Sequence, residues 1–280
     1  MVVAPAQKMR VISWNLLHGQ VIPPVGEQDW RQSLITSATD IASHFKPDFI
    51  SLQEVDYLQP RSGNINQTKL IAESMGLKYW YYLPALLGTP GSRWQRVKNL
   101  EPGIISQNTN NPSPNTSYGI GFATNQLVKN VYVKYLGRSL VGMPLLVPRD
   151  NGHGVKFIYV KDEPRIALIA QLENGLTITT THLSFVPGVN IFQLNRLSSY
   201  LKKLPGKQIL VGDLNLPANI PTRVSGFRSL LSQSTYPSWK PSIQFDYIMK
   251  GRSDSITAEG LGRFRPKISD HIPIGAELNF

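Results

Sequence analysis

The chain contains no cysteine, and this absence removes several kinds of site at once. None of its 280 residues is cysteine, which excludes disulfide bonds, zinc–thiolate centres and cysteine nucleophiles. The sequence also has no apolar run close to the roughly 20 residues that a membrane-spanning helix needs, and its first ten residues lack the apolar core of a secretory signal. We therefore expect a cytoplasmic protein without a transmembrane segment.

Acidic residues are scarce relative to basic ones. The sequence holds 18 Asp and Glu against 29 Lys and Arg, which gives a formal net charge of +11. A surface of this kind attracts polyanions such as nucleic acid. A generally basic, solvated surface without a specific ligand has the same composition, so the charge alone does not choose between these two interpretations.

Apolar runs typical of strands alternate with a few segments whose apolar residues recur at helical intervals. Strands are predicted at residues 9–15, 48–55, 79–83, 119–124, 165–172, 176–183, 208–213, 245–249 and 271–278. Helices are predicted at residues 29–45, 66–75 and 189–204, and Gly76 and Pro205 end the last two. Because the composition does not break along the chain, we expect one domain over residues 9–280 and a short extension at residues 1–8.

Two long segments, residues 84–117 and 137–164, show no periodicity over most of their length, although residues 155–160 could form a strand. A stretch of this kind in a compact domain is usually a functional loop or disordered. The first segment carries Trp94 among Arg93, Arg96 and Lys98. This cluster predicts either a base stacked on the indole or a solvated basic loop with a partly buried tryptophan.

Polar residues stand at the ends of several predicted strands. Alternate side chains of a strand point the same way, so the face of Ile209 and Val211 leads to Asp213, and to Asn215 if the chain stays extended. By the same rule, Glu54 shares a face with residues 50 and 52, and Asn15 shares a face with residues 11 and 13. His182 shares a face with residues 176, 178 and 180. A carboxylate at such a place is costly to bury unless it is paired or bound to a metal. One such residue alone is typical of a turn, but the repetition predicts a shared polar pocket.

Six motifs follow one another along the chain, and together they suggest a family. They are Ile12-Ser13-Trp14-Asn15, Ser51-Leu52-Gln53-Glu54-Val55, Thr181-His182-Leu183, Gly212-Asp213-Leu214-Asn215, Phe245-Asp246-Tyr247-Ile248 and Ser269-Asp270-His271. In this order the chain resembles the endonuclease/exonuclease/phosphatase superfamily, with its deoxyribonuclease I-like fold. The resemblance implies an α/β protein of the α+β type, a four-layer sandwich of two packed mixed β-sheets flanked by helices, with the site at the edge where strand ends from both sheets meet.

The resemblance also implies an activity and residue roles. It predicts a metal-dependent hydrolase acting on phosphoester bonds, with Mg²⁺ or Mn²⁺ held by Glu54, Asn15 and Asp270. The implied catalytic residues are His182, Asp213, Asn215, Asp246 and His271, with either Asp213 or His271 as the general base. Arg165 and Tyr118 are expected on the substrate side of the pocket.

The substrate stays open between several classes. The basic run of Arg263, Arg265 and Lys267 shortly before Asp270 favours nucleic acid, because these side chains could neutralise the phosphates that flank the cleaved one. We therefore expect a monomeric phosphodiesterase acting on nucleic acid. A lipid head group, an inositol phosphate or a nucleotide would suit the same pocket, and a non-catalytic module that binds phosphate is a third alternative.

Overall fold

The computed structural model describes residues 7–97, 103–148 and 155–280. The helices are α1 (Trp30–Phe45), α2 (Gln67–Met75), α3 (Val189–Leu201) and α4 (Ile220–Val224), with short 3₁₀ turns η1 (Leu17–Gly19) and η2 (Pro60–Ser62). The strands are β1 (Lys8–Asn15), β2 (Phe49–Tyr57), β3 (Tyr79–Gly88), β4 (Trp94–Arg96), β5 (Ile105–Ser106), β6 (Ser117–Thr124), β7 (Val128–Gly137), β8 (Met143–Pro148), β9 (Val155–Val160), β10 (Arg165–Leu172), β11 (Leu176–His182), β12 (Lys207–Asp213), β13 (Phe227–Ser229), β14 (Asp246–Gly251), β15 (Thr257–Gly260) and β16 (Ile274–Asn279).

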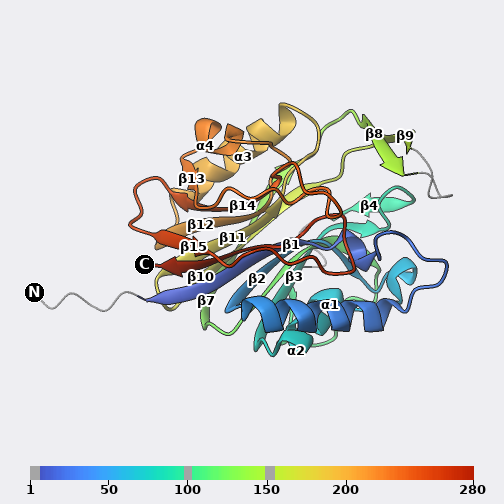
Figure 1. Cartoon of the computed structure of the whole chain (residues 1–280), viewed down its shortest axis with the longest axis horizontal. Coiled ribbons are helices and arrows are strands. Elements are labelled where there is room, and N and C mark those ends of the chain that lie inside the picture. The colour runs from blue at the N-terminus through green and yellow to red at the C-terminus, as the bar shows by residue number, and fades with distance from the viewer. Residues whose placement is uncertain (1–6, 98–102, 149–154) are drawn as a thin grey trace, which may run out of the picture.

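The strands form two mixed sheets that pack against each other, with helices on both outer faces (Figure 1). The first sheet has the order β15-β16-β1-β2-β6-β3-β4, with β5 paired to β3, and the second has the order β13-β14-β12-β11-β10-β7. In each sheet one central pair is parallel, β1 with β2 and β11 with β12. Helices α1 and α2 cover the first sheet, and α3 and α4 cover the second (Figure 1). The predicted four-layer sandwich is thus confirmed.

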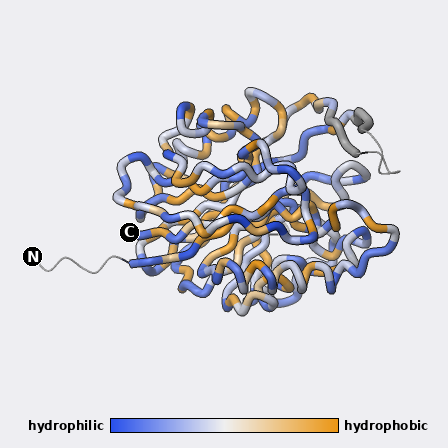
Figure 2. Tube along the Cα trace, in the orientation of Figure 1, coloured by the Kyte–Doolittle hydropathy of each residue, from blue (hydrophilic) through white to orange (hydrophobic). Residues whose placement is uncertain are grey.

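Alternation along the strands produces three apolar layers. Val11 of β1 lies between the two sheets together with Ile178 of β11 and Val211 of β12, whereas Ile12 and Trp14 face the helices. A further layer lies between the second sheet and α3. Figure 2 shows the apolar residues concentrated along the central strands of the sandwich. Because both faces of these strands are buried, their sequences are nearly continuous apolar runs.

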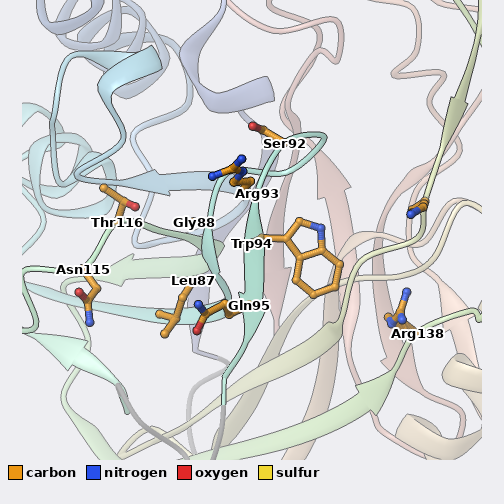
Figure 3. Close-up of a pocket in the computed structure, with 10 residues that line it drawn as sticks. Leu87, Gly88, Ser92, Arg93, Trp94, Gln95, Asn115, Thr116 and Arg138 are labelled. Carbon is orange, nitrogen blue, oxygen red and sulfur yellow. The ribbon is translucent and has the colours of Figure 1, made fainter.

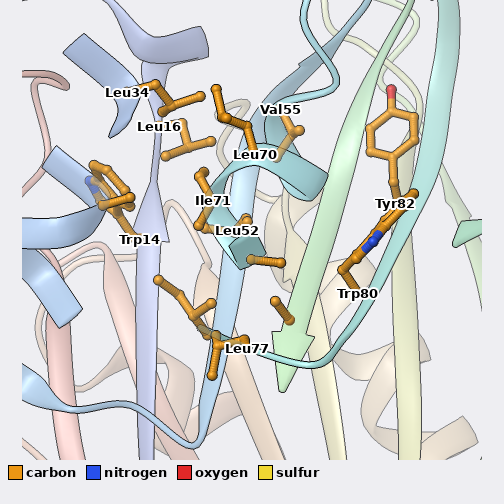
Figure 4. Packing of buried hydrophobic residues seen from close by; sticks show 14 of the residues in the cluster. Trp14, Leu16, Leu34, Leu52, Val55, Leu70, Ile71, Leu77, Trp80 and Tyr82 are labelled. Atoms are coloured by element: carbon orange, nitrogen blue, oxygen red, sulfur yellow. The ribbon is translucent and has the colours of Figure 1, made fainter. Parts of the chain in front are cut away.

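The layer under α1 and α2 shows how local signals fix the helices. Asp29 and Asn66 cap the two helices, since their side chains accept hydrogen bonds from backbone amides three residues later. Gly76 ends α2 in the left-handed conformation that glycine adopts at low cost. Leu34 of α1 and Ile71 of α2 then pack on the first sheet (Figure 4). The predicted starts of both helices are confirmed to within one residue.

Several predicted boundaries were wrong. The last strand begins at Ile274 and not at His271, because Ser269 adopts a left-handed φ of 76° and Pro273 has no amide hydrogen to donate to a ladder. Helix α3 ends at Leu201 and not at residue 204, and a turn follows it.

The two segments that lacked periodicity contain short strands. Residues 84–117 carry β4 and β5, and residues 137–164 carry the hairpin of β8 and β9, which includes the possible strand at residues 155–160. Strand β7 was not predicted, because as an edge strand it is largely half-exposed and lacks a continuous apolar face. Lys98 and residues 1–6 of the predicted extension lie outside the described residues, and Lys8 already belongs to β1.

In the part of the chain that the structure describes, no helix combines the length and the apolar character needed to cross a bilayer.

Candidate active site

The predicted site residues meet where the ends of β1, β11 and β12 lie beside a bulge in β2. The side chain of Asn15 joins the two sheets there. Its Nδ2 donates to Oε1 of Glu54 in the first sheet at 3.0 Å and to Oδ2 of Asp213 in the second sheet at 3.0 Å. Its Oδ1 accepts from the backbone amide of Leu17. One buried amide group therefore holds two carboxylates at a fixed spacing across the sandwich.

Simple alternation explains the position of three of the polar strand ends. Val11, Ile178 and Val211 lie in the layer between the sheets, so Asn15, His182 and Asp213, which follow at even spacing, point into the same space. The predicted convergence of these three residues is confirmed by the contacts around Asp213. Its Oδ2 lies 3.6 Å from Nε2 of His182.

Glu54 reaches this space by a different route from the one that alternation predicts. Ile50 and Leu52 face the helices, so continued alternation would have turned Glu54 toward α1 and α2. The register of β2 against β6 shifts between Leu52 and Val55, and Glu54 has a φ of 55°. This β-bulge turns the carboxylate to the inter-sheet side, as bulges beside functional sites often do. The reason given from the sequence was wrong, although the residue was the right one.

Asn215 also departs from the extended path expected after β12. Its φ is 50°, and its backbone amide donates to Oδ1 of Asp213 at 2.9 Å, which closes a tight turn. Its side-chain Nδ2 donates to the carbonyl of Leu183 at 3.0 Å and lies 3.2 Å from Nε2 of His182. Since an amide nitrogen can only donate, this Nε2 is the acceptor. Burial, and after it the charges of Arg165 and His271, lowers the pKa of His182 well below its usual range.

His271 is held by Asp246 and lies close to Asp213. Its Nδ1 forms a 2.7 Å hydrogen bond with Oδ2 of Asp246, and its Nε2 lies 3.8 Å from Oδ2 of Asp213. Burial disfavours the imidazolium, but the carboxylates of Asp246, Asp213 and Asp270 outweigh it and raise the pKa of His271 well above its usual range. Burial and then the charge of Asp246 raise the pKa of Asp213 to about 6.

Two residues that the sequence analysis gave no role hold this arrangement in place. Ser269 donates its hydroxyl to the backbone carbonyl of Asn15 at 2.6 Å and accepts from the amide of His271 at 3.0 Å. The ring of Tyr236 lies 5.0 Å from the imidazole of His271. Ser269 stands in a quoted motif and could have been found there, whereas Tyr236 has no local signal.

The carboxylates of Glu54 and Asp270 fit a hard divalent cation. Asn15 turns Nδ2 to Glu54, and its Oδ1 accepts from the amide of Leu17, so its place as a ligand stays a prediction. Burial, and after it the charge of Asp270, raises the pKa of Glu54 to about 7, and burial also raises the pKa of Asp270. Among the described residues neither carboxylate forms an ion pair with a lysine or arginine. Two carboxylates that repel each other without a cationic partner are stabilised by a bound cation, and Glu54 retains enough exposure for a cation to reach it.

A second group of possible ligands lies nearby. Asp213, Asp246 and His271 offer ligand atoms that all lie within 4.8 Å of one another. These atoms already bond to each other and to Asn15. A metal here would have to replace the hydrogen bond between His271 and Asp246. Among the described residues Oε2 of Glu54 accepts no hydrogen bond, so the Glu54 carboxylate fits a magnesium-like ion better.

Arg165 and Tyr118 line a small cavity with His182. The guanidinium of Arg165 is buried, lies 3.3 Å from Oδ1 of Asp162 and 3.9 Å from Oε2 of Glu163, and leaves its Nε without a described partner. Its carboxylate neighbours explain how this cation is tolerated in a buried position. The expected contact of these two residues with substrate stays a prediction.

The basic run before Asp270 lies on the surface. Arg263, Arg265 and Lys267 are exposed, and Arg265 donates to the backbone carbonyl of Ile22 at 3.4 Å. Lys267 accepts through its backbone carbonyl from Ile22, so the run is tied to the loop that follows η1. Their role toward a substrate likewise stays a prediction.

With this geometry in view, comparison with known proteins is informative. A model of the Endonuclease/Exonuclease/phosphatase family matches residues 12–271. The chain belongs to this family. Its members are hydrolases that act on phosphoester bonds, so the predicted enzyme class is confirmed. The matched span begins within the first of the six motifs and ends at His271 in the last.

Solved structures show the same fold at low sequence identity. An endonuclease/exonuclease/phosphatase from Beutenbergia cavernae is 18% identical with a TM-score of 0.59, over 98% of this chain and 72% of that chain. The mannosyl-6-phosphatase Bt3783 of Bacteroides thetaiotaomicron is 14% identical with a TM-score of 0.59, over 97% and 100%. D. rerio TDP2 complexed with a single-strand DNA product is 17% identical with a TM-score of 0.52, over 98% and 100%. No curated protein sequence matches the chain.

The buried Glu163 predicts a pH dependence of stability. Burial outweighs the attraction of Arg165 and raises the pKa of Glu163 from 4.5 to about 7. The folded state thus favours the protonated acid, and this contribution is fully present below pH 4.5 and is lost as the pH rises through about 7. Between these pH values this group should lower the free energy of unfolding of the wild type by on the order of 3 kcal/mol, and the Glu163→Gln variant should not show this decrease. Urea unfolding in EDTA at both pH values measures it.

Glu173→Gln serves as the matched control, because Glu173 is exposed. The two variants should differ in how the free energy of unfolding changes with pH. Identical pH dependence in both variants and the wild type would mean that Glu163 is ionised in the folded protein throughout this range.

Proposed function

We propose that the protein is a divalent-cation-dependent phosphodiesterase that acts on nucleic acid by attack of water on phosphorus. The observation that carries the proposal is the Asn15 amide, which holds Glu54 and Asp213 together at 3.0 Å each. It sets a carboxylate suited to a cation beside a group suited to proton transfer. Attack on an anionic phosphoester needs both charge neutralisation and proton transfer.

Glu54, Asn15 and Asp270 would hold Mg²⁺ or Mn²⁺, which when bound neutralises charge on the phosphoryl oxygens. Side chains of the protein carry out proton transfer and hold the reacting groups in position. His271, whose ring is fixed through Nδ1 by Asp246, directs Nε2 toward Asp213. Either of these two groups can exchange a proton with the attacking water. Asn215 holds His182 and Asp213 in place through its side chain and its backbone amide.

Nucleic acid is the favoured substrate because of charge. The acidic centre is set in a chain with a net charge of +11, and Arg263, Arg265 and Lys267 are all exposed within a few residues of Asp270. Cations placed beside a cleaved phosphate neutralise its neighbours in a polymer and have little to contact on a small substrate. The fold itself is found both in TDP2 with a DNA product and in a mannosyl-6-phosphatase. A small phosphoester, an inositol phosphate or a lipid head group is therefore the second candidate.

The cation can be tested without relying on activity alone. In Glu54→Gln we expect at least a ~100-fold fall in turnover of a phosphodiester, since one ligand charge is lost. Mg²⁺ should raise the unfolding temperature of the wild type and raise that of the variant much less. Glu73→Gln, on the exposed face of α2, is the control with the same chemical change. Undiminished wild-type turnover in excess EDTA would contradict the proposal.

The proton-transfer group predicts a second set of effects. His271→Ala and Asp213→Ala should each lower kcat by about 10²- to 10⁴-fold, and circular dichroism should show both variants folded. His44→Ala is the control, because His44 stacks on Phe264 beside α1 and has no place in the site. A folded His271→Ala protein that keeps more than about a tenth of wild-type kcat would remove this residue from the mechanism.

The substrate class is tested by the response to salt. Replacing Arg263, Arg265 and Lys267 together by Ser should flatten the slope of log K against log salt for duplex DNA by about two to three units. Hydrolysis of bis(p-nitrophenyl) phosphate should hardly change. If the triple variant loses activity on DNA and on bis(p-nitrophenyl) phosphate equally, this loop supports the structure of the catalytic centre and does not contact the DNA. Loss of neither would favour a small phosphoester as the substrate.

A further inference from the structure

A second cavity lies between the β3–β4 hairpin and the chain that enters and leaves the β8–β9 hairpin (Figure 3). Its volume is about 640 Å³, which lies within the range of small-molecule binding sites. The described residues that line it are Leu87, Gly88, Ser92, Arg93, Trp94, Gln95, Asn115, Thr116, Arg138 and Lys161. None of these lining residues is acidic.

Three cations and one indole face this cavity. The guanidinium of Arg138 lies over the ring of Trp94, 5.6 Å from its centroid. Arg93 and Lys161 are exposed on the two sides, and in Figure 3 the indole projects from the hairpin toward Arg138. Together they present cationic groups and a flat aromatic surface, the combination that single-stranded nucleic acid meets in its binding grooves.

The position of Trp94 is fixed by the fold. Gly88 has a φ of 93° and pairs with Trp94 across the hairpin, and a Cβ at residue 88 would overlap the carbonyl of Arg93. The side chain of Gln59 donates to the carbonyls of Gly88 and Ser117 and accepts from the hydroxyl of Thr89. The hairpin is thus anchored to the loop that follows β2, the strand that carries Glu54.

The cavity is joined to the catalytic centre by a short chain of contacts. Arg138 donates to the backbone carbonyl of Asp162 at 3.5 Å, and Oδ1 of Asp162 lies 3.3 Å from Nη2 of Arg165. Arg165 in turn shares its small cavity with His182. Lys161 directly precedes Asp162, so the exposed cation of the cavity is followed in the chain by the buried Asp162, Glu163 and Arg165 group next to His182.

We propose that this cavity binds one nucleotide of a single-stranded substrate that extends beyond the cleaved phosphate. The base stacks on Trp94, and Arg93 and Lys161 contact its phosphates. This assignment rests on the proposed action on nucleic acid and specifies its substrate as single-stranded at this position.

Binding is measured in EDTA, where no cleavage occurs, by the fluorescence anisotropy of a fluorescein-labelled hexathymidine. Trp94→Ala should raise Kd by about tenfold or more, the loss typical of one stacked base, and Trp94→Phe should keep most of the affinity. Arg93→Gln with Lys161→Gln should lower the slope of log K against log salt by about 1.4, the value for two phosphates on a single strand. None of these variants should change hydrolysis of bis(p-nitrophenyl) phosphate.

Lys129→Gln with Arg228→Gln is the matched control, since it removes the same charge at the far end of β7 and on β13, where both residues are exposed. This pair should leave the slope closer to that of the wild type. The inference is overturned if the control pair has the same effect, if Trp94→Ala binds like the wild type, or if the wild type does not bind the oligonucleotide. Trp94-dependent binding to anionic vesicles without oligonucleotide binding would assign the cavity to a lipid surface and also overturn it.

The two proposals fail in different ways. If Mg²⁺ supports no cleavage of any oligonucleotide, the proposed function is wrong whatever the binding data show. If cleavage occurs but Trp94→Ala binds the oligonucleotide in EDTA with the Kd of the wild type, the proposed function stands and the assignment of this cavity to a nucleotide is wrong.

Discussion

The contact on which the rest of the site depends is the hydrogen bonding of a single amide group to two carboxylates from opposite sheets. Asn15 ends β1, and its partners are Glu54, at the bulge within β2, and Asp213, at the end of β12. Buried carboxylates repel each other and lose hydration, so they stay together only where donors are supplied at fixed positions. The packing of the two sheets therefore sets the chemistry, because a relative shift of the sheets would separate acceptor from donor.

The distribution of charge separates two tasks. Carboxylates gather inside, where Glu54, Asp213, Asp246 and Asp270 raise one another's pKa or that of His271, while the excess of basic residues is spread over the chain. A local negative centre attracts a cation and would repel a phosphoester, whereas the wider positive field attracts the phosphoester from a distance. In the proposed reaction the cation and the outer arginines and lysines would act together on the same substrate.

The sequence was sufficient to predict the layers and the identity of the clustered residues, but not every path by which they meet. Alternation placed Asn15, His182 and Asp213 correctly, because these strands run straight to their ends. It failed at Glu54 and Asn215, since both have positive φ values of 55° and 50°. Asparagine tolerates this conformation and is common in turns, whereas a glutamate within a strand gives no such signal. The sequence offered Trp94 as a stacking residue but not the cavity around it, because Trp94 of β4 and Arg138, which follows β7, meet only through the tertiary fold.

The bulge in β2 has a consequence for how this protein can change over evolutionary time. On one side of it the even-numbered residues Ile50 and Leu52 face the helices, and beyond it the odd-numbered Val55 and Tyr57 do. Loss of the codon for Glu54 would leave one residue between Leu52 and Val55 and restore an unbroken strand with these apolar residues still facing the helices. Such a protein would keep its sandwich and lose its Glu54 carboxylate. The residue proposed to hold the cation is thus the extra residue of the bulge, so the proposed catalytic carboxylate can be removed without changing the pattern of buried and exposed positions in β2.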